Sequence, residues 1–589
     1  MTRQSASNRN NQASLIIDGA DAWSNSVKNP LRNYPGRVAE GSDATDRLFP
    51  LASPTYPTFD DIPDNPKVYV TGTCIARTIE NTLLKTNAVL LSRDDGLKRK
   101  EGSGNLYGVL TKYNLPAMVN EFIWALSPDQ MAHTPDQFIE HRPGEFVDLQ
   151  LGGTEVRGSV EMLTAHRTLF NNLYAKSRDA DVIIIPLAAI EVWYDTQFDV
   201  YLNYRPSRKM CIANSGRFEL RVLNYQGVME HLQTLHTLLR KTCKPTAKIL
   251  YAITPAATPM TYLDADAMHQ SVYTKSLQHA AIQDFLATIN DPQAGYVPFY
   301  EANILQDQRV NFIPLDYRHM TKAIGMRYVG QMMKTLKPND ITFLEVYSIG
   351  TANALLQIDE KDKAFDVLNN PKLDGSQNID LLELKSSLAS KLSQTDIALE
   401  CYRKILQFSP DDPAELLSKL AHSGLKIGAL EFVREMIDSF ARQFPDETDH
   451  LELLNSLYSK RAKDVDPAGR KMITQRMHAL WTEQKYDEVI QLLDQHKTLT
   501  SQNANLCFQK GLAYSKLHQS EAALENFDHA ITHFPDHHLS LERATLLAIQ
   551  LGMFDRANDY INLHEARFLS RIEPRERMAA QYEKKRNSA

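Results

Sequence analysis

Residues 67–77 read Lys-Val-Tyr-Val-Thr-Gly-Thr-Cys-Ile-Ala-Arg, and this stretch decides the fold class of the first half of the chain. Residues 68–70 are a short run of β-branched and aromatic side chains, which predicts a strand. The apolar residues of 75–84 then recur at helical spacing, which predicts a helix. Gly72 lies between the two elements and can supply a tight turn. Cys74 therefore falls at a junction of strand, turn and helix.

The rest of the first half repeats this alternation of strand and helix. Apolar runs predict strands at residues 181–187, 248–253 and 296–300. Helical periodicity predicts helices at residues 220–240, 276–289 and 321–336. Strands that are apolar throughout, rather than in alternation, and that are separated by helices indicate a parallel sheet covered on both faces. The fold class of the first half is therefore α/β.

Past Pro338 the strand-like runs stop, and almost every segment is amphipathic and of helical length. One segment carries small and aromatic residues at the offsets typical of a tetratricopeptide repeat: Gly511, Tyr514, Ala523, Phe527, Ala530 and Pro535. The small residues let the two helices of a pair approach, and the aromatic side chain fills the seam between them. We expect an all-α solenoid of the tetratricopeptide type, with an irregular α-helical domain as the alternative. Such a solenoid docks a protein or peptide partner on its concave face.

These patterns divide the chain into four parts. Residues 1–28 are polar and expected to be disordered, and the α/β domain is expected at 29–336. The helical repeats are expected at 345–570, followed by a charged C-terminal tail at 571–589.

Composition narrows the class of protein. The formal net charge of -7 implies no basic face, so we expect no nucleic-acid partner. The five cysteines are scattered, which favours a reducing compartment over a disulfide framework or a zinc site. The most apolar stretch, residues 182–189, is far shorter than the roughly 20 residues that a membrane span needs. With no signal-like segment at the start, we expect a cytoplasmic protein without a membrane span.

Cys74 is the first candidate for chemistry. The unpaired N–H groups and the positive dipole end of a helix start stabilise a thiolate, so we expect its pKa to be lowered. A junction after a parallel strand also presents a side chain at the carboxyl edge of the sheet, where ligands bind in open α/β folds. The alternative is a small buried apolar cysteine, since cysteine is among the most buried residue types.

Asp316 and His319 form the second candidate. Their spacing puts an acid beside a base, so the carboxylate can orient the imidazole while the other ring nitrogen faces a nucleophile. Asp266 and His269 have the same spacing, so spacing alone is not specific. Position favours Asp316 and His319, because they follow the last expected strand and open the last helix of the domain.

From about Asn29 to Leu336 the chain resembles the GSCFA family, which looks like a distant relative of the SGNH/GDSL hydrolases. Residues 72–76 read Gly-Thr-Cys-Ile-Ala and keep the Gly, Cys and Ala of the name-giving motif. Other segments similar to family motifs occur in the family's order: 29–35, 187–193, 254–255, 274–276 (a helix start), 298–301 and Asp316-x-x-His319.

The resemblance implies a flavodoxin-like parallel sheet of the SGNH type, with Cys74 as nucleophile, His319 as base and Asp316 as orienting carboxylate. It implies hydrolysis of an acyl ester, or acyl transfer to a sugar hydroxyl, with a small acyl ester or a glycan as substrate. We expect no cofactor and no metal, since neither the cysteines nor the histidines have the spacing of a metal site. Ala188 and Ile190 stand where the family has Gly and Thr, and the usual Gly and Asn oxyanion donors find no match here.

Five further residues are expected to support substrate binding or the oxyanion: Gly72, Thr73, Gly108, Glu191 and Trp193. The backbone N–H groups of Cys74 and of a residue near Gly108 are the expected donors. The alternative is a catalytically degenerate α/β domain in a scaffold whose repeats carry the biological role.

Overall fold

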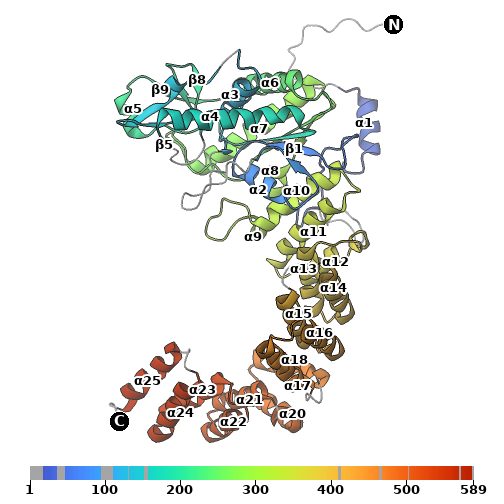
Figure 1. The fold of residues 1–589 in the computed structure, drawn as a ribbon, viewed down its shortest axis with the longest axis vertical. Helices are drawn as coiled ribbons and strands as arrows, with labels where there is room; N and C mark the ends of the chain where they lie inside the picture. Colours follow the sequence, from blue (N-terminus) through green and yellow to red (C-terminus); the bar gives the residue numbers. More distant parts are fainter. Residues whose placement is uncertain are drawn as a thin grey trace. The chain divides into compact units, whose positions relative to one another are not determined.

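In the computed structural model the described residues are 17–32, 34–35, 47–93, 110–129, 132–151, 157–408, 413–462, 467–501, 503–568 and 572–586. They belong to two compact units, Met1–Pro413 and Ala414–Ala589, and Figure 1 labels most of their helices and some of their strands. Residues Gly19–Lys28 form helix α1, capped by Asp18, rather than a disordered segment. Within the described ranges no helix is both long and apolar enough to cross a membrane.

The first unit is built on a five-stranded parallel sheet. Its spatial order is β11-β10-β6-β1-β2, and every neighbouring pair is parallel. The strands are β1 Lys67–Val70, β2 Val89–Leu90, β6 Val182–Leu187, β10 Lys248–Ile253 and β11 Ala294–Val297. Read from the other edge this is the strand order of flavodoxin-like sheets, whose switch point lies beside the first strand. The predicted parallel α/β fold is thus confirmed.

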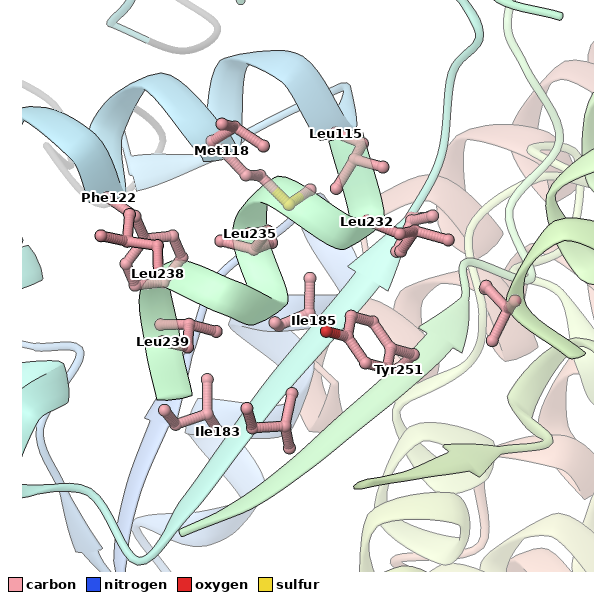
Figure 2. Packing of buried hydrophobic residues seen from close by; sticks show 14 of the residues in the cluster. Leu115, Met118, Phe122, Ile183, Ile185, Leu232, Leu235, Leu238, Leu239 and Tyr251 are labelled. Carbon is pink, nitrogen blue, oxygen red and sulfur yellow. The ribbon is translucent and has the colours of Figure 1, made fainter. Parts of the chain in front are cut away.

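Helices α3 (Leu115–Leu126), α6 (Tyr225–Thr242) and α7 (Ala267–Ile289) contribute to one hydrophobic cluster with the sheet. Figure 2 shows leucines of α6 and apolar residues of α3 lying over Ile183, Ile185 and Tyr251. Burying each large aliphatic side chain stabilises the fold by about 1.5–3 kcal/mol. Helices α2 (Cys74–Leu83) and α10 (Lys322–Leu336) pack against each other elsewhere in the unit.

Two small antiparallel sheets were not foreseen from the sequence. One has the order β3-β4-β5 and the other β8-β7-β9. Their strands are β3 Ile139–Arg142, β4 Glu145–Val147, β5 Arg157–Gly158, β7 Glu191–Asp195, β8 Val200–Tyr201 and β9 Phe218–Val222. The other α-helices that the structure describes before residue 336 are α4 Val160–Ala175, α5 Arg208–Ala213, α8 Phe299–Leu305 and α9 Gln308–Asn311.

Two sequence predictions are wrong at their ends. The helix expected at 220–240 begins at Tyr225, because residues 218–222 pair with β7 as strand β9. The strand expected at 296–300 ends at Val297, because Pro298 has no N–H for a ladder and precedes α8.

The first compact unit continues beyond residue 336. Helix α11 (Ile341–Leu356) packs closely along α10. A Cβ on Gly330 would lie 2.5 Å from the Tyr347 backbone, and one on Gly350 would collide with the backbone at Arg327. The two helices therefore touch at backbone level. Three further helices complete the unit: α12 Lys361–Leu368, α13 Ile379–Lys391 and α14 Thr395–Phe408.

The second unit is helical throughout its described residues. Its helices are α15 Pro413–Ile427, α16 Leu430–Gln443, α17 Thr448–Ala462, α18 Pro467–Thr482, α19 Tyr486–Gln495, α20 Lys497–Ser501, α21 Ala504–Lys516, α22 Ser520–His533, α23 His538–Gln550, α24 Phe554–Arg567 and α25 Ile572–Arg586. In the α21–α22 pair, a Cβ on Gly511 would lie 2.5 Å from the Phe527 ring. The predicted seam, with a glycine facing an aromatic residue, is confirmed. Helix α25 lies in the expected charged tail and packs on α23 and α24.

Candidate active site

The turn after β1 brings Cys74 to the carboxyl edge of the sheet. Gly72 has φ +134°, and a Cβ there would lie 2.9 Å from the Pro186 ring, so only glycine fits. Thr73 is the N-cap residue of α2, and its hydroxyl lies 2.8 Å from that of Thr254, which follows β10. Cys74 is the first residue of α2 and is exposed. The expected junction of strand, turn and helix is present at the switch point of the sheet.

The expectation of a lowered thiol pKa at Cys74 is wrong. Atoms packed around the sulfur withhold water from the thiolate, and this desolvation raises the pKa above its usual value. The charge of Arg318, the Thr73 hydroxyl and the backbone N–H groups of Ile75 and Cys74 act in the opposite direction. Their combined effect is smaller than that of desolvation, so near neutral pH the protonated thiol is the favoured form of Cys74.

Asp316 and His319 form the expected pair in the loop between α9 and α10. The carboxylate Oδ2 lies 2.6 Å from His319 Nδ1, and this hydrogen bond lowers the pKa of Asp316. Leu315 and Tyr317 both have positive φ, at 70° and 54°. Such backbone strain costs about 1–3 kcal/mol per residue and is concentrated at functional sites. Asp266, the competing candidate, instead caps α7 by accepting from the Met268 N–H.

The second ring nitrogen of His319 faces an unexpected neighbour. His319 Nε2 lies 3.2 Å from Arg318 Nη2, so the structure places a guanidinium, rather than Cys74, against it. Arg318 also acts electrostatically on the thiol of Cys74. Arg318 is thus near both partners of the expected nucleophile–base pair.

Lys275 is a site residue that the sequence reasoning missed. It lies within α7, which begins at Ala267, so the expected helix start at 274–276 is wrong. The side chain is 2% exposed, and its amine has a pKa of about 8. Burial lowers this pKa from its usual value, and the electrostatic effect of Cys74 opposes the shift only in part. The amine lies 3.4 Å from the Ala188 carbonyl. A positive charge buried beside the thiol can stabilise a thiolate or an oxyanion.

A clue to Lys275 was available in the sequence. Helix α7 buries a polar face that consists of Gln270, Ser271, Thr274, Lys275 and Gln278. These residues recur at helical spacing, as apolar residues do on a core face, and a polar stripe of this kind can mark the wall of a site.

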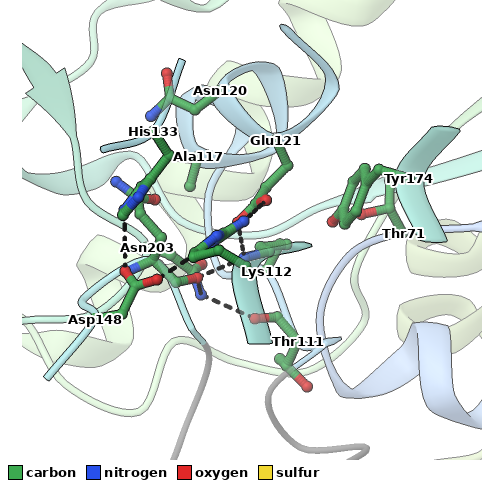
Figure 3. Close-up of polar contacts among 12 residues, drawn as sticks. Thr71, Thr111, Lys112, Ala117, Asn120, Glu121, His133, Asp148, Tyr174 and Asn203 are labelled. Atoms are coloured by element: carbon green, nitrogen blue, oxygen red, sulfur yellow. Dashed lines mark hydrogen bonds and ion pairs between the residues drawn. The ribbon is translucent and has the colours of Figure 1, made fainter. Parts of the chain in front are cut away.

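Residues 110–114 run alongside the turn that carries Cys74. Lys112 donates its backbone N–H to the Gly72 carbonyl at 2.8 Å. Figure 3 shows its side chain within a buried polar network, where the amine donates to Glu121 and to the Gln150 carbonyl, each at 2.5 Å. The next residue, Tyr113, donates its backbone N–H to Asn203 Oδ1 at 2.8 Å. This network fixes one side of the turn.

Glu191 and Trp193 both contact the loop that holds Tyr262. The Glu191 carboxylate accepts hydrogen bonds from the Thr261 hydroxyl and the Tyr262 N–H, each at 2.7 Å, so it holds that loop. Trp193 packs edge-on against Tyr262, with ring centroids 5.3 Å apart, and lines a cavity. Gly108 lies outside the described residues.

Comparison with known proteins agrees with this architecture. Residues 67–331 match the GSCFA family, and residues 504–537 match the tetratricopeptide repeat. The chain therefore carries a GSCFA-type domain at residues 67–331 and a tetratricopeptide repeat at residues 504–537. No curated protein sequence matches this chain significantly.

Several solved tetratricopeptide structures are similar to parts of the chain. A tetratricopeptide repeat protein from Parabacteroides merdae has 12% identity and a TM-score of 0.22, covering 44% of this chain and 93% of its own. The TPR2AB domain of yeast Sti1, in a complex with pHSP90, has 13% identity and a TM-score of 0.19, covering 40% and 95%. A thermophilic repeat protein from Thermus thermophilus has 15% identity and a TM-score of 0.16, covering 40% and 98%.

Proposed function

We propose that the GSCFA domain is an acyl-ester hydrolase or acyltransferase in which Cys74 is the nucleophile, His319 the base and Asp316 the orienting carboxylate. The observation that carries the proposal is the Asp316–His319 hydrogen bond of 2.6 Å. It fixes the tautomer that leaves Nε2 free of its proton, as a base requires. The location of Cys74 at the carboxyl edge of the sheet supports the nucleophile role.

The reaction has two steps. His319 takes the thiol proton, the Cys74 sulfur attacks the ester carbonyl carbon, and the bond to the alcohol oxygen breaks as the alcohol receives that proton. The acyl group is then held as a thioester. Water or a sugar hydroxyl attacks the thioester carbonyl and passes its proton through His319 to the departing sulfur. The backbone N–H of Cys74 and the amine of Lys275 are the donors we assign to the oxyanion.

In this scheme Arg318 must leave Nε2 of His319 before the thiol proton can be taken. Its side chain lies on a loop with two strained residues, which suits a group that moves when substrate binds. The protein partner is assigned to the tetratricopeptide region. The five free cysteines support a cytoplasmic location.

Hydrolysis of a p-nitrophenyl ester by the full chain tests the proposal. Cys74→Ala and His319→Ala should each abolish turnover, and the double variant should be no worse, because residues that act as one unit are not additive. Cys401→Ala, in α14 and away from the candidate site, is the matched control and should keep full activity. Hydrolysis that is unchanged in both single variants would contradict the assignment of Cys74 as nucleophile and His319 as base.

Cys74→Ser distinguishes the thiol from a hydroxyl. Serine is the nucleophile in the SGNH relatives, but a hydroxyl needs a stronger base than a thiol does. We expect a large loss of turnover with substrate binding intact. Turnover equal to that of the unaltered chain would show that thiolate chemistry is not needed.

A second candidate function is supported by one observation. With Arg318 Nη2 at 3.2 Å from His319 Nε2, the base is occupied, as expected for a degenerate site in a repeat scaffold. Acyl-ester probes separate the two candidates. Labelling that maps to Cys74 supports the enzyme, whereas the absence of any labelled peptide supports the scaffold.

A further inference from the structure

A cavity of about 680 Å³ lies in the first unit, apart from the Cys74 turn. Its lining comes from the small antiparallel sheets and from the segment around α5. Cavities of roughly 300–1,000 Å³ are the usual size of small-molecule sites. Neither Cys74 nor His319 is among its lining residues, so it is a separate compartment.

The charged residues of this cavity are mostly positive. Arg205 and Arg208 line it, and Asp148 is the carboxylate among the lining residues that the structure describes. Burial opposes ionisation of Asp148, but His133 and Arg167 outweigh that effect and hold its pKa below the usual range. Asp148 is therefore already neutralised by its own partners. In a chain with a net charge of -7, this local excess of guanidinium groups favours an anionic ligand.

The cavity also offers aromatic rings. Trp193, Tyr204 and Tyr262 are among its lining residues. The Trp193 Nε1–H is buried and has no acceptor among the described residues, so a ligand oxygen would satisfy it. Flat amphipathic rings beside hydrogen-bond donors suit the face of a sugar better than they suit a bare inorganic anion.

A short path of hydrogen bonds joins the cavity wall to the candidate nucleophile. Asn203, next to Tyr204 of the wall, accepts from the backbone N–H of Tyr113. The backbone of the residue before Tyr113 is bonded to Gly72, two residues before Cys74. The phenol of Tyr113 interacts electrostatically with both Tyr204 and Cys74. Asn203 and the backbone of residues 112–113 thus link the cavity wall to the Cys74 turn.

We infer that this cavity binds a sugar that carries a carboxylate or a phosphate, and that it is the acceptor site for the acyl group. The acceptor role rests on the function proposed above, whereas the binding itself does not. The guanidinium groups of Arg205 and Arg208 engage the anionic group, and Trp193 packs on the sugar ring.

Calorimetric titration of the full chain with four probes tests the inference: glucuronate, glucose 6-phosphate, glucose and inorganic phosphate. Glucuronate or glucose 6-phosphate should bind in roughly the millimolar range, and the better of the two identifies the anionic group. Glucose and phosphate should each bind at least about tenfold more weakly, since glucose lacks the anionic group and phosphate lacks the sugar ring.

Variants identify the site. The double change Arg205→Gln/Arg208→Gln and the single change Trp193→Leu should each weaken binding of the charged sugar at least about tenfold. Both arginines are exposed, so the double variant should fold. Arg142→Gln, exposed on β3 and outside the lining, is the matched control and should bind normally. No measurable heat with either charged sugar, equal binding of glucose, or normal binding by the double variant would overturn the inference.

The same titration on Cys74→Ala keeps the two proposals separate. Binding should survive in this variant while ester hydrolysis is lost. If hydrolysis proves independent of Cys74 but charged sugars still bind, the proposed chemistry fails and the cavity assignment stands. If sugars do not bind but hydrolysis needs Cys74, the cavity assignment alone fails.

Discussion

Replacing Lys275 by methionine should stabilise the first compact unit and impair the proposed chemistry. The amine is buried, and its pKa falls from 10.5 to about 8. At about 1.36 kcal/mol per pKa unit, keeping this buried amine charged near pH 7 lowers the free energy of unfolding by up to about 3 kcal/mol. Methionine has a similar length and no charge, so the free energy of unfolding should rise by up to that amount, while ester hydrolysis should fall.

The effect has a defined pH window. Between about pH 8 and pH 10.5 the unfolded chain holds a proton at Lys275 that the folded chain has released, so the stability of the unaltered protein rises with pH there. The advantage of the Lys275→Met variant should therefore be largest below about pH 8 and disappear above about pH 10.5.

Urea unfolding followed by tryptophan fluorescence measures this difference. A Trp481→Phe background removes the tryptophan of the second unit, so that the remaining signal reports on the first. Lys241→Met, at an exposed position of α6, is the matched control and should change stability by less than about 0.5 kcal/mol. A Lys275→Met variant that is less stable near pH 7, or whose advantage does not shrink as pH rises, would refute the reasoning.

Three further changes test other parts of the molecule. Gly511→Leu should destabilise the second unit by about 1–3 kcal/mol, because even its Cβ would lie 2.5 Å from the Phe527 ring; an unchanged thermal melt would contradict this packing. Cys74 should be alkylated faster than the less exposed Cys211, at a rate that rises with pH because burial raises the pKa of both thiols; equal rates by peptide mass spectrometry would argue against a distinct Cys74. Asp316→Asn should slow ester hydrolysis less than removal of the nucleophile does, since it misorients the base without deleting it; complete loss would mean that the carboxylate does more than orient.

Much of the fold could be predicted from the sequence, because its central strands are continuous apolar runs. Residues 182–187 and 249–253 are fully buried on both faces of the sheet, which favours apolar side chains throughout. The shorter strands could not be found in this way. Strand β2 has only two residues, and β9 is partly exposed along its length, so neither carries a burial pattern.

The candidate site was predictable only in part. The spacing of Asp316 and His319 was enough to pair them, since both lie on one short loop. The contact of Arg318 with its neighbour His319 depends on the conformation of their loop, which the spacing of residues does not reveal. The burial of Lys275 depends on how α7 packs against distant segments, and no local pattern encodes that. The direction of the Cys74 pKa was misjudged for the same reason. A helix start can be read from sequence, whereas the desolvation that opposes it comes from the surrounding fold.

The glycine contacts between α10 and α11 have a mechanical consequence. Helix α10 begins at Lys322, three residues after His319, and Gly330 and Gly350 leave no side chain to cushion its contact with α11. Because no side chain separates the two helices at these contacts, neither helix can shift toward the other without a clash of backbone atoms. A substitution that displaces α11 should therefore also shift α10, whose first turn follows the loop of Asp316 and His319.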